Sequence, residues 1–142
     1  MRRAGYKRAV EAVGLQPVAE LSGNNTTDGG MKVMEDQLIA NPGINLVLCM
    51  NDDTAIGASN AIKAAGVSGI SVIGFDGNAS AIEIIAKGDS PFVATIAQQP
   101  ALMGYQSVMV TVAALKGEKV PVVQPVDTVI IDASNAAQFV NK

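Results

Sequence analysis

Short apolar runs alternate with helix-like stretches along this chain of 142 residues. The runs are bounded by Gly, Pro, Asn or Asp, a pattern typical of buried strands. They predict strands at 17–21, 46–50, 71–75, 93–97 and 128–131. Between the runs, apolar residues recur every three or four positions, which is the period of a helix. They predict helices at 3–13, 31–40, 54–65, 79–87 and 102–116, with a polar loop before 31.

The order of these elements indicates the fold class. Parallel strands joined by helices need right-handed crossovers, and a sheet built in this way is covered on both faces. The predicted strands agree, because their apolar runs are continuous and do not alternate with polar residues. The sequence therefore predicts an α/β domain with a doubly wound parallel sheet.

Polar side chains follow three consecutive predicted strands at the point where each strand ends. Strand 46–50 is followed by Asn51, Asp52 and Asp53, strand 71–75 by Asp76, and strand 93–97 by Gln98. In an open parallel sheet, ligands bind beyond the carboxyl ends of the strands. These residues are therefore candidates for one binding site.

Local structure offers a second explanation for several of them. Asp52 or Asp53 suits the N-cap of the helix at 54–65, because a carboxylate there accepts hydrogen bonds from free backbone N–H groups. Asp76 begins an Asp-Gly-Asn sequence, which is typical of a turn. Gln98 has the weakest such explanation, since Gln is not a favoured N-cap residue.

Composition limits the chemistry open to this site. The chain has no His, which removes the commonest general base. A net charge of −3 without a basic run, and aromatic residues at 4%, argue against nucleic acid as a partner. The single Cys49 lies inside an apolar run and is predicted to be a buried small hydrophobe. No apolar stretch is long enough for a membrane span, and the basic N-terminus lacks the apolar region of a signal peptide.

Two kinds of ligand fit the polar residues. Asp52, Asp53 and Asp76 could hold Mg²⁺ in a phosphoryl-transfer enzyme. The chain has no glycine-rich phosphate loop, however, so an enzyme is disfavoured. One carboxylate together with amides and an Arg suits uncharged hydroxyl groups instead, because the carboxylate accepts while amides both donate and accept. We therefore expect no metal and no cofactor.

Five sequence motifs carry a family resemblance. They are "MNDDTAIGASNAIKAAG" from Met50, "ISVIGFDG" from Ile70, "VATIAQQP" from Val93, "LKGEKV" from Leu115 and "PVDTVIIDASN" from Pro125. In this order and spacing, the chain resembles the C-terminal half of the ribose-binding-protein-like family, the type I periplasmic sugar-binding components of ABC transporters. The resemblance implies the periplasmic binding protein-like I fold and binding of a monosaccharide. The alternative is the effector-binding domain of a lac-repressor-type transcription regulator, which shares the fold and the "VIGFD" strand.

The resemblance also implies roles for individual residues. Sugar contacts are expected at Arg2, Asn51, Phe75, Asp76 and Gln98. By the resemblance, Arg2 donates to sugar oxygens, the Phe75 ring packs near the sugar, and Asp76 accepts two hydroxyl hydrogen bonds.

Two further positions, Asp127 and Asn25, take their expected roles from the family, and Gln98 takes a second role. Gln98 and Asp127 are expected at the hinge between two lobes. Asn25 stands where many family members place an aromatic residue that stacks on the sugar. With Asn in place of the aromatic residue, we expect the site to prefer a different sugar or to bind with a weaker affinity.

Family members are longer and close the sugar between two lobes. By the resemblance, 1–142 forms the C-terminal sugar-binding lobe, within which 99–126 packs on an N-terminal lobe absent from this chain. A central strand is expected before the first helix, and Met1 stands where that strand would already have ended. We therefore expect an incomplete sheet, a fragment that binds sugar weakly or not at all, and self-association through the open gap. A membrane permease is the expected partner, and the periplasm or the extracellular space is the expected location.

Overall fold

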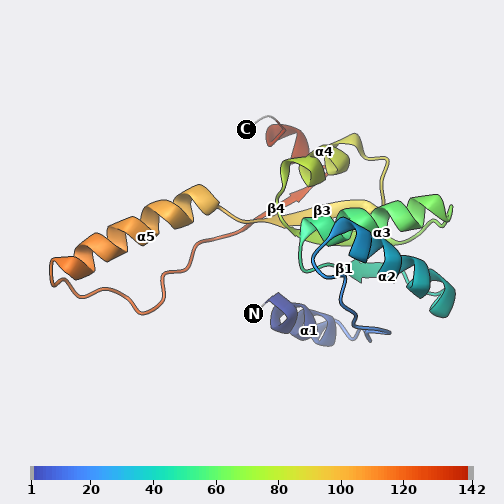
Figure 1. Cartoon of the computed structure of the whole chain (residues 1–142), viewed down its shortest axis with the longest axis horizontal. Helices are drawn as coiled ribbons and strands as arrows, with labels where there is room; N and C mark the ends of the chain where they lie inside the picture. The colour runs from blue at the N-terminus through green and yellow to red at the C-terminus, as the bar shows by residue number, and fades with distance from the viewer. Residues whose placement is uncertain (1, 141–142) are drawn as a thin grey trace.

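Helices and strands alternate along residues 2–140, the part of the chain that the computed structural model describes (Figure 1). The elements are α1 (Arg2–Ala12), α2 (Thr27–Ala40), β1 (Leu46–Leu48), α3 (Asp52–Ala64), β2 (Ser71–Asp76), α4 (Ala79–Lys87), β3 (Phe92–Ala97), α5 (Pro100–Leu115), β4 (Val129–Asp132) and the short 3-10 helix η1 (Ala136–Gln138). Each predicted helix is present, and each predicted strand except the first. The predicted α/β fold class is confirmed.

The four strands form one open sheet in the order β1-β2-β3-β4. β1, β2 and β3 run parallel as predicted, but β4 runs antiparallel to β3, with Val129 opposite Ala97. The prediction of an entirely parallel sheet is therefore wrong for the last strand. The chain leaves β3 at its carboxyl end and returns beside that same end, where Gln99 Nε2 donates to the Asp127 carbonyl oxygen at 2.8 Å. A strand that enters the sheet there has to run in the opposite direction.

The strand predicted at 17–21 does not form. This segment pairs with no described strand, and Val18 and Leu21 are 66% and 58% exposed. A strand needs a neighbouring backbone, and β1 lies at the edge of the sheet with the backbone groups of Leu46 and Leu48 pointing away from β2. The central strand expected before α1 would already have ended where Met1 stands, and Met1 lies outside the described residues.

α2 begins at Thr27, earlier than the sequence predicts. Thr26 caps the helix, because its Oγ1 accepts a hydrogen bond from the Gly29 N–H at 3.0 Å. Glycines such as those of this first turn are typical of a loop. At position 30, however, glycine is required because the backbone of α2 packs closely against α3. A Cβ on Gly30 would lie 2.3 Å from the carbonyl oxygen of Thr54 on α3. The contact between α2 and α3 therefore overrides the low helix propensity of glycine.

The core lies between the sheet and helices α2, α3 and α4. α2 packs on α3, while α3 and α4 pack on the strands. The largest fully buried hydrophobic side chains are those of Phe92, Ile62, Ile85, Ile131 and Val72. The other face of the sheet is less covered, since Ile73 and Phe75 on β2 are only half-buried. The expected cover of helices is therefore complete on one face only.

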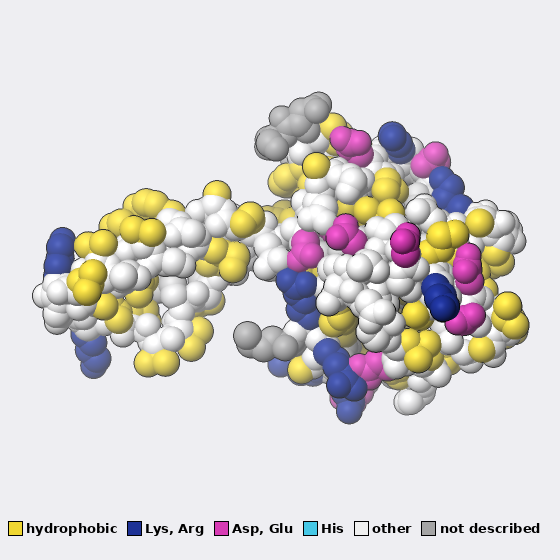
Figure 2. Space-filling model, in the orientation of Figure 1, with side chains coloured by type: hydrophobic (Ala, Val, Ile, Leu, Met, Phe, Trp, Pro, Cys, Tyr) yellow, Lys and Arg dark blue, Asp and Glu magenta, His cyan; other side chains and the backbone are white. Residues whose placement is uncertain are grey.

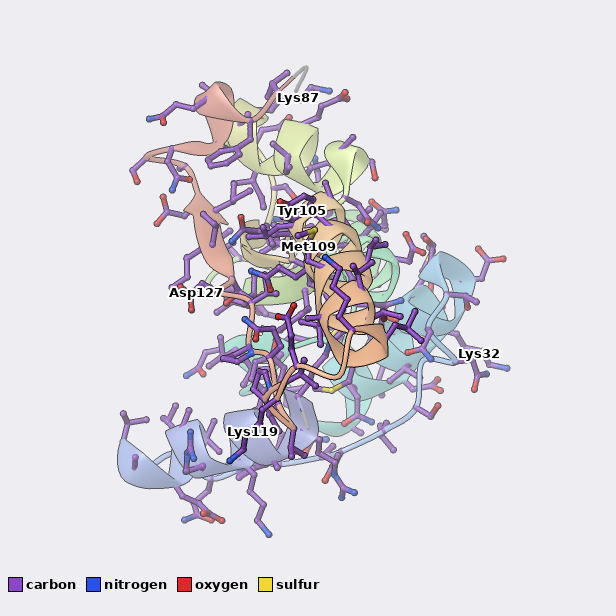
Figure 3. The ribbon with its side chains drawn as sticks, turned by 90° about the vertical axis from the view of Figure 1, so that its left-hand side faces the viewer. Lys32, Lys87, Tyr105, Met109, Lys119 and Asp127 are labelled. Atoms are coloured by element: carbon purple, nitrogen blue, oxygen red, sulfur yellow. The ribbon has the colours of Figure 1, made fainter. Side chains whose placement is uncertain are left out.

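α5 and the segment that returns from it project away from the rest of the molecule (Figure 1, Figure 2). α5 carries no charged residue, and none of its residues is buried. Its exposed hydrophobic side chains are those of Leu102, Met103, Tyr105, Val108, Met109, Val112 and Leu115. Figure 3 shows Tyr105 and Met109 along α5, and Asp127 on the segment that leads back to the sheet. Within residues 2–140, no helix has both the length and the apolar character that a membrane crossing requires.

Val72→Ala and Val108→Ala make the same change in the core and on α5. Val72 is fully buried, whereas Val108 is 62% exposed. We expect Val72→Ala to lower the free energy of unfolding by about 2 kcal/mol, because buried methyl groups are lost and a cavity forms. Val108→Ala is expected to change it by less than about 0.5 kcal/mol, because the lost side chain is exposed and Ala favours a helix. Urea unfolding followed by circular dichroism measures both, and equal losses would contradict the separation of α5 from the core.

Candidate functional site

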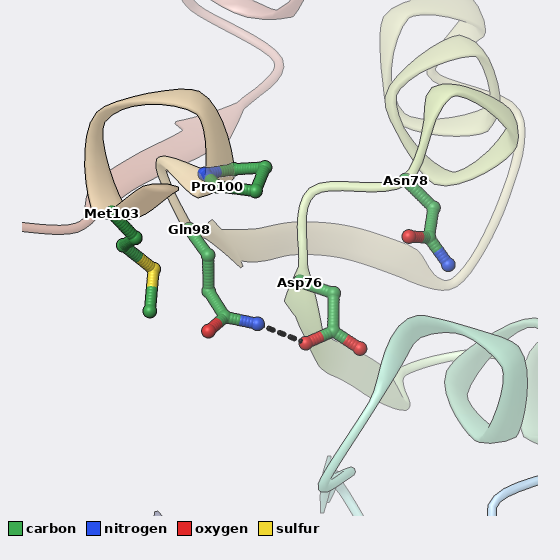
Figure 4. A pocket seen from close by; sticks show the side chains of 5 residues that line it. All are labelled: Asp76, Asn78, Gln98, Pro100 and Met103. Carbon is green, nitrogen blue, oxygen red and sulfur yellow. Dashed lines mark hydrogen bonds between the residues drawn. The ribbon is translucent and has the colours of Figure 1, made fainter. Parts of the chain in front are cut away.

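The carboxylate of Asp76 brings three elements together. Asp76 ends β2, and its Oδ1 accepts hydrogen bonds from Gln98 Nε2 at 2.6 Å and from Arg2 Nη2 at 2.9 Å. Gln98 follows β3, and Arg2 begins α1. Figure 4 shows the Gln98 side chain reaching Asp76 from the neighbouring strand. The ion pair is partly shielded from water, because the side chains of Arg2 and Asp76 are 36% and 27% exposed.

Arg2 is fixed by two further contacts. Its Nη1 donates to the Met50 carbonyl oxygen at 2.6 Å, and its guanidinium carbon lies 4.0 Å from the centre of the Phe75 ring. One helical turn later, the Tyr6 hydroxyl donates to the Cys49 carbonyl oxygen at 3.2 Å. The first turns of α1 are thereby fastened across the carboxyl end of β1. Four of the five expected contact residues, Arg2, Phe75, Asp76 and Gln98, therefore form one cluster.

A hollow of about 440 Å³ lies beside this cluster. It is lined by Asp76, Asn78, Gln98, Pro100 and Met103 (Figure 4). Ligand pockets in proteins typically have volumes of about 300–1,000 Å³, so a small polar molecule fits. Asp76 Oδ2 accepts no hydrogen bond from any side chain or backbone group in residues 2–140. One carboxylate oxygen is therefore held by the protein, and the other is available to a ligand.

Three residues that line the hollow are not predicted by the sequence: Asn78, Pro100 and Met103. Asn78 occupies the N-cap position of α4, yet its side chain makes no capping hydrogen bond. Its amide is therefore available to a ligand, and its place two residues after Asp76 is the signal that could have indicated this. Met103 gives no such signal, because an apolar residue at helical spacing is typical of a core.

The residue that caps α3 is Asn51, so the prediction of a cap at Asp52 or Asp53 is wrong. Asn51 Oδ1 accepts from the Thr54 N–H at 3.1 Å, and its Nδ2 donates to the Asn25 carbonyl oxygen at 3.1 Å. The reason is the backbone, which is still extended at Asn51 (φ −150°, ψ 168°) and becomes helical at the next residue. Asn51 lies at the end of β1 as predicted, but it does not line the hollow.

The two aspartates that follow have different surroundings. Asp53 is exposed in the first turn of α3, where the helix dipole favours a negative charge. Asp52 is fully buried and accepts hydrogen bonds from the N–H groups of Gly77 and Asn78 and from the Thr95 hydroxyl. Burial raises the pKa of Asp52, and these hydrogen bonds oppose the rise. Within residues 2–140, no three Asp, Glu or Cys side chains converge in an arrangement suited to a metal ion.

The expected hinge residues, Gln98 and Asp127, lie on the two segments that connect α5 and its returning segment to the sheet. These two segments lie side by side, because Gln99 Nε2 on one donates a hydrogen bond to the Asp127 carbonyl oxygen on the other. Gln98 is also tied to β2 through its backbone, since its N–H donates to the Asp76 carbonyl oxygen at 3.1 Å. Asp127 is exposed and lies outside the hollow.

Cys49 takes no part in chemistry at this site. It is 5% exposed, and its burial, with a smaller contribution from the charge of Asp52, raises the pKa of its thiol to about 12. The thiol therefore stays protonated at neutral pH, and a protonated thiol is a poor nucleophile. The prediction that Cys49 is a buried small hydrophobe is confirmed.

Comparison with known proteins identifies the family. The family model described as periplasmic binding protein domain matches residues 1–119. The ribose import binding protein of Salmonella typhimurium is 35% identical over 130 residues, which make up 92% of this chain and 43% of that protein. The chain belongs to the periplasmic binding protein domain family. It spans less than half the length of this relative.

Solved structures show the same fold. The ABC transporter solute binding protein of Actinobacillus succinogenes with bound D-allose gives a TM-score of 0.79 at 32% identity, over 87% of this chain and 44% of that one. The solute binding protein of Bacillus halodurans C-125 with bound myo-inositol gives 0.84 at 29% identity, over 99% of this chain and 48% of that one. The resemblance to sugar-binding transport proteins is confirmed, and these matches favour it over the effector domain of a transcription regulator.

Proposed function

We propose that this chain is the C-terminal lobe of a solute-binding protein for an ABC transporter and that it binds a monosaccharide, ribose or a related sugar, without catalysing a reaction. One observation carries the proposal. Asp76 is held through Oδ1 by Arg2 and Gln98 and presents Oδ2 beside a hollow of about 440 Å³. Ribose, D-allose and myo-inositol, which are named for the relatives above, are uncharged and rich in hydroxyl groups. A fixed carboxylate accepts hydrogen bonds from such groups.

The residues of the site take complementary roles in this proposal. Asp76 accepts from two sugar hydroxyl groups, while Arg2 and Gln98 donate to sugar oxygens. The Phe75 ring, with Arg2 stacked on it, forms a rigid surface against an apolar part of the sugar. Asn51 lies outside the hollow and is proposed as a contact at its margin, where its Oδ1, which caps α3, keeps a second lone pair for a sugar hydroxyl.

A second lobe completes the site. We propose that 99–126, which contains α5, packs on that second, N-terminal lobe. We also propose that Gln98 and Asp127 lie at the hinge between the two lobes. The exposed hydrophobic side chains of α5 support this arrangement, since a helix without charge and with no buried residue is expected to be covered by a partner. A membrane permease as partner and a periplasmic location belong to the same proposal, and the family supports them.

The sugar site is tested by NMR titration of the isolated, isotope-labelled chain with ribose, D-allose and myo-inositol. We expect binding weaker than micromolar, with the largest shifts at Asp76, Asn78 and Gln98, because only one wall of the cleft is present. Asp76→Asn is expected to weaken binding about 10- to 100-fold, the effect of losing a hydrogen bond to a charged group. Asp53→Asn removes a similar charge from an exposed position and serves as the matched control.

Each part of the proposal can fail separately in this titration. A micromolar affinity for the isolated chain would contradict the need for a second lobe. Shifts centred away from Asp76, or equal losses for Asp76→Asn and Asp53→Asn, would contradict the site.

We also propose that the isolated chain self-associates through the open edge of β1, where the backbone groups of Leu46 and Leu48 have no strand partner in residues 2–140. Sedimentation velocity over a range of concentrations is expected to show dimers or larger species. Val108→Lys places a charge on α5 and leaves β1 unchanged, so association is expected to persist in this variant. A clean monomer would refute the proposal, and a monomer only in Val108→Lys would assign the interface to α5.

A further inference from the structure

A buried carboxylate lies directly beneath the turn that carries Asp76. Asp52 Oδ2 accepts hydrogen bonds from the N–H groups of Gly77 and Asn78 at 2.8 and 2.7 Å, and its Oδ1 accepts from Thr95 Oγ1 at 2.6 Å. Asp52 is fully buried and does not line the hollow. The Asp52 carboxylate therefore does not reach the ligand, and its Oδ2 binds the backbone of the two residues that follow Asp76.

The turn needs such support because its backbone is strained. Asp76 has φ +126° and Gly77 has φ +79°, and the first is a conformation that residues other than glycine rarely adopt. Strain of this kind persists only where the surroundings fix it, and it occurs preferentially at functional sites. On one side, Asp52 accepts hydrogen bonds from the N–H groups of Gly77 and Asn78, and Thr95 Oγ1 also accepts from the Gly77 N–H at 3.3 Å. On the other side, the Gln98 N–H donates to the Asp76 carbonyl oxygen.

Gly74, on the strand that leads to this turn, makes room for the carboxylate. A Cβ on Gly74 would lie 2.3 Å from Asp52 Oδ1 and 2.7 Å from the Phe92 ring. Gly77, at the other end of the Gly-Phe-Asp-Gly sequence, has a positive φ, and a Cβ on it would lie 2.5 Å from the Cβ of Ala97, so this position also excludes a side chain. The first glycine of the motif is therefore explained by the buried Asp52, and the second by the turn that Asp52 holds.

We propose that Asp52 is a positioning residue for ligand binding. Through the amides of Gly77 and Asn78 it fixes the turn in which Asp76 places Oδ1 against Arg2 and Gln98 and leaves Oδ2 to the ligand. Gly74 belongs to the same arrangement, because a side chain at this position would collide with the Asp52 carboxylate. The effect on sugar affinity rests on the proposed function, whereas the effect on the turn does not.

The experiment compares Asp52→Ala, Asp52→Asn and Gly74→Ala in the full chain, first without any sugar. We expect Asp52→Ala and Gly74→Ala to shift the amide resonances of Gly77 and Asn78 and the side-chain amide resonance of Gln98. Asp52→Asn is expected to restore much of the wild-type pattern, because the Asn oxygen can still accept from both amides while its NH₂ group meets Thr95. Ser59 is a buried polar residue of α3 whose side-chain hydroxyl makes no hydrogen bond, so Ser59→Ala is the matched control and is expected to leave these resonances in place.

The second readout is sugar affinity by the same titration. Asp52→Ala and Gly74→Ala are expected to lower it about tenfold or more, with Asp52→Asn in between and Ser59→Ala unchanged. A folded Asp52→Ala chain with wild-type Gln98 resonances and wild-type affinity would overturn the proposal. If Asp52→Ala does not fold, Gly74→Ala decides the proposal by the same criteria. If the isolated wild type binds no sugar, which a single wall of the cleft allows, the proposed function is tested in the two-lobed protein instead. The resonances of Gly77, Asn78 and Gln98 then decide on their own whether Asp52 holds the turn.

Discussion

The hydrogen bonds that Arg2 and Gln98 donate to one oxygen of Asp76 are the interaction on which the rest of the site depends. They join the start of α1 to the ends of β2 and β3, and they neutralise the carboxylate without using its second oxygen. A paired charge with a free lone-pair acceptor suits an uncharged ligand rich in hydroxyl groups better than an ionic one. The same contacts orient Arg2 over Phe75, so the apolar and polar parts of the site are fixed together.

The features that depend on residue pattern alone could be predicted from the sequence. Continuous apolar runs indicated β1, β2 and β3, and the rule that ligands bind at the carboxyl ends of parallel strands brought Asp76 and Gln98 together. Arg2 and Phe75 entered only through the family resemblance.

The features that depend on tertiary contacts could not be predicted. Whether 17–21 forms a strand depends on a neighbouring backbone that its own residues do not reveal. The direction of β4 depends on where the chain returns after α5. The choice between Asn51 and Asp52 as the cap of α3 depends on which of the two residues has an extended backbone. The burial of Asp52 depends on the space left by Gly74 on β2. Apart from the cap, each of these features is decided by residues that are distant in the sequence.

The described part of the chain separates into a packed body and a projecting α5 segment. The body buries its largest side chains between one face of the sheet and α2 to α4, whereas α5 buries none. The proposed second lobe would cover this exposed apolar helix. The chain spans less than half the length of its relatives, which are long enough to supply such a lobe within a single polypeptide. The hollow beside Asp76 reaches Pro100 and Met103 of α5, so the same second lobe would close over the ligand.

The central claim is that this chain is one competent wall of a two-walled sugar cleft. The most direct measurement is calorimetry on a chimera in which the chain replaces the matching segment of the Salmonella typhimurium ribose import binding protein. We expect the folded chimera to bind ribose or a related sugar with at least micromolar affinity, and this affinity to exceed that of the isolated chain. A folded chimera that binds none of these sugars, or an isolated chain that binds as tightly as the chimera, would contradict the claim.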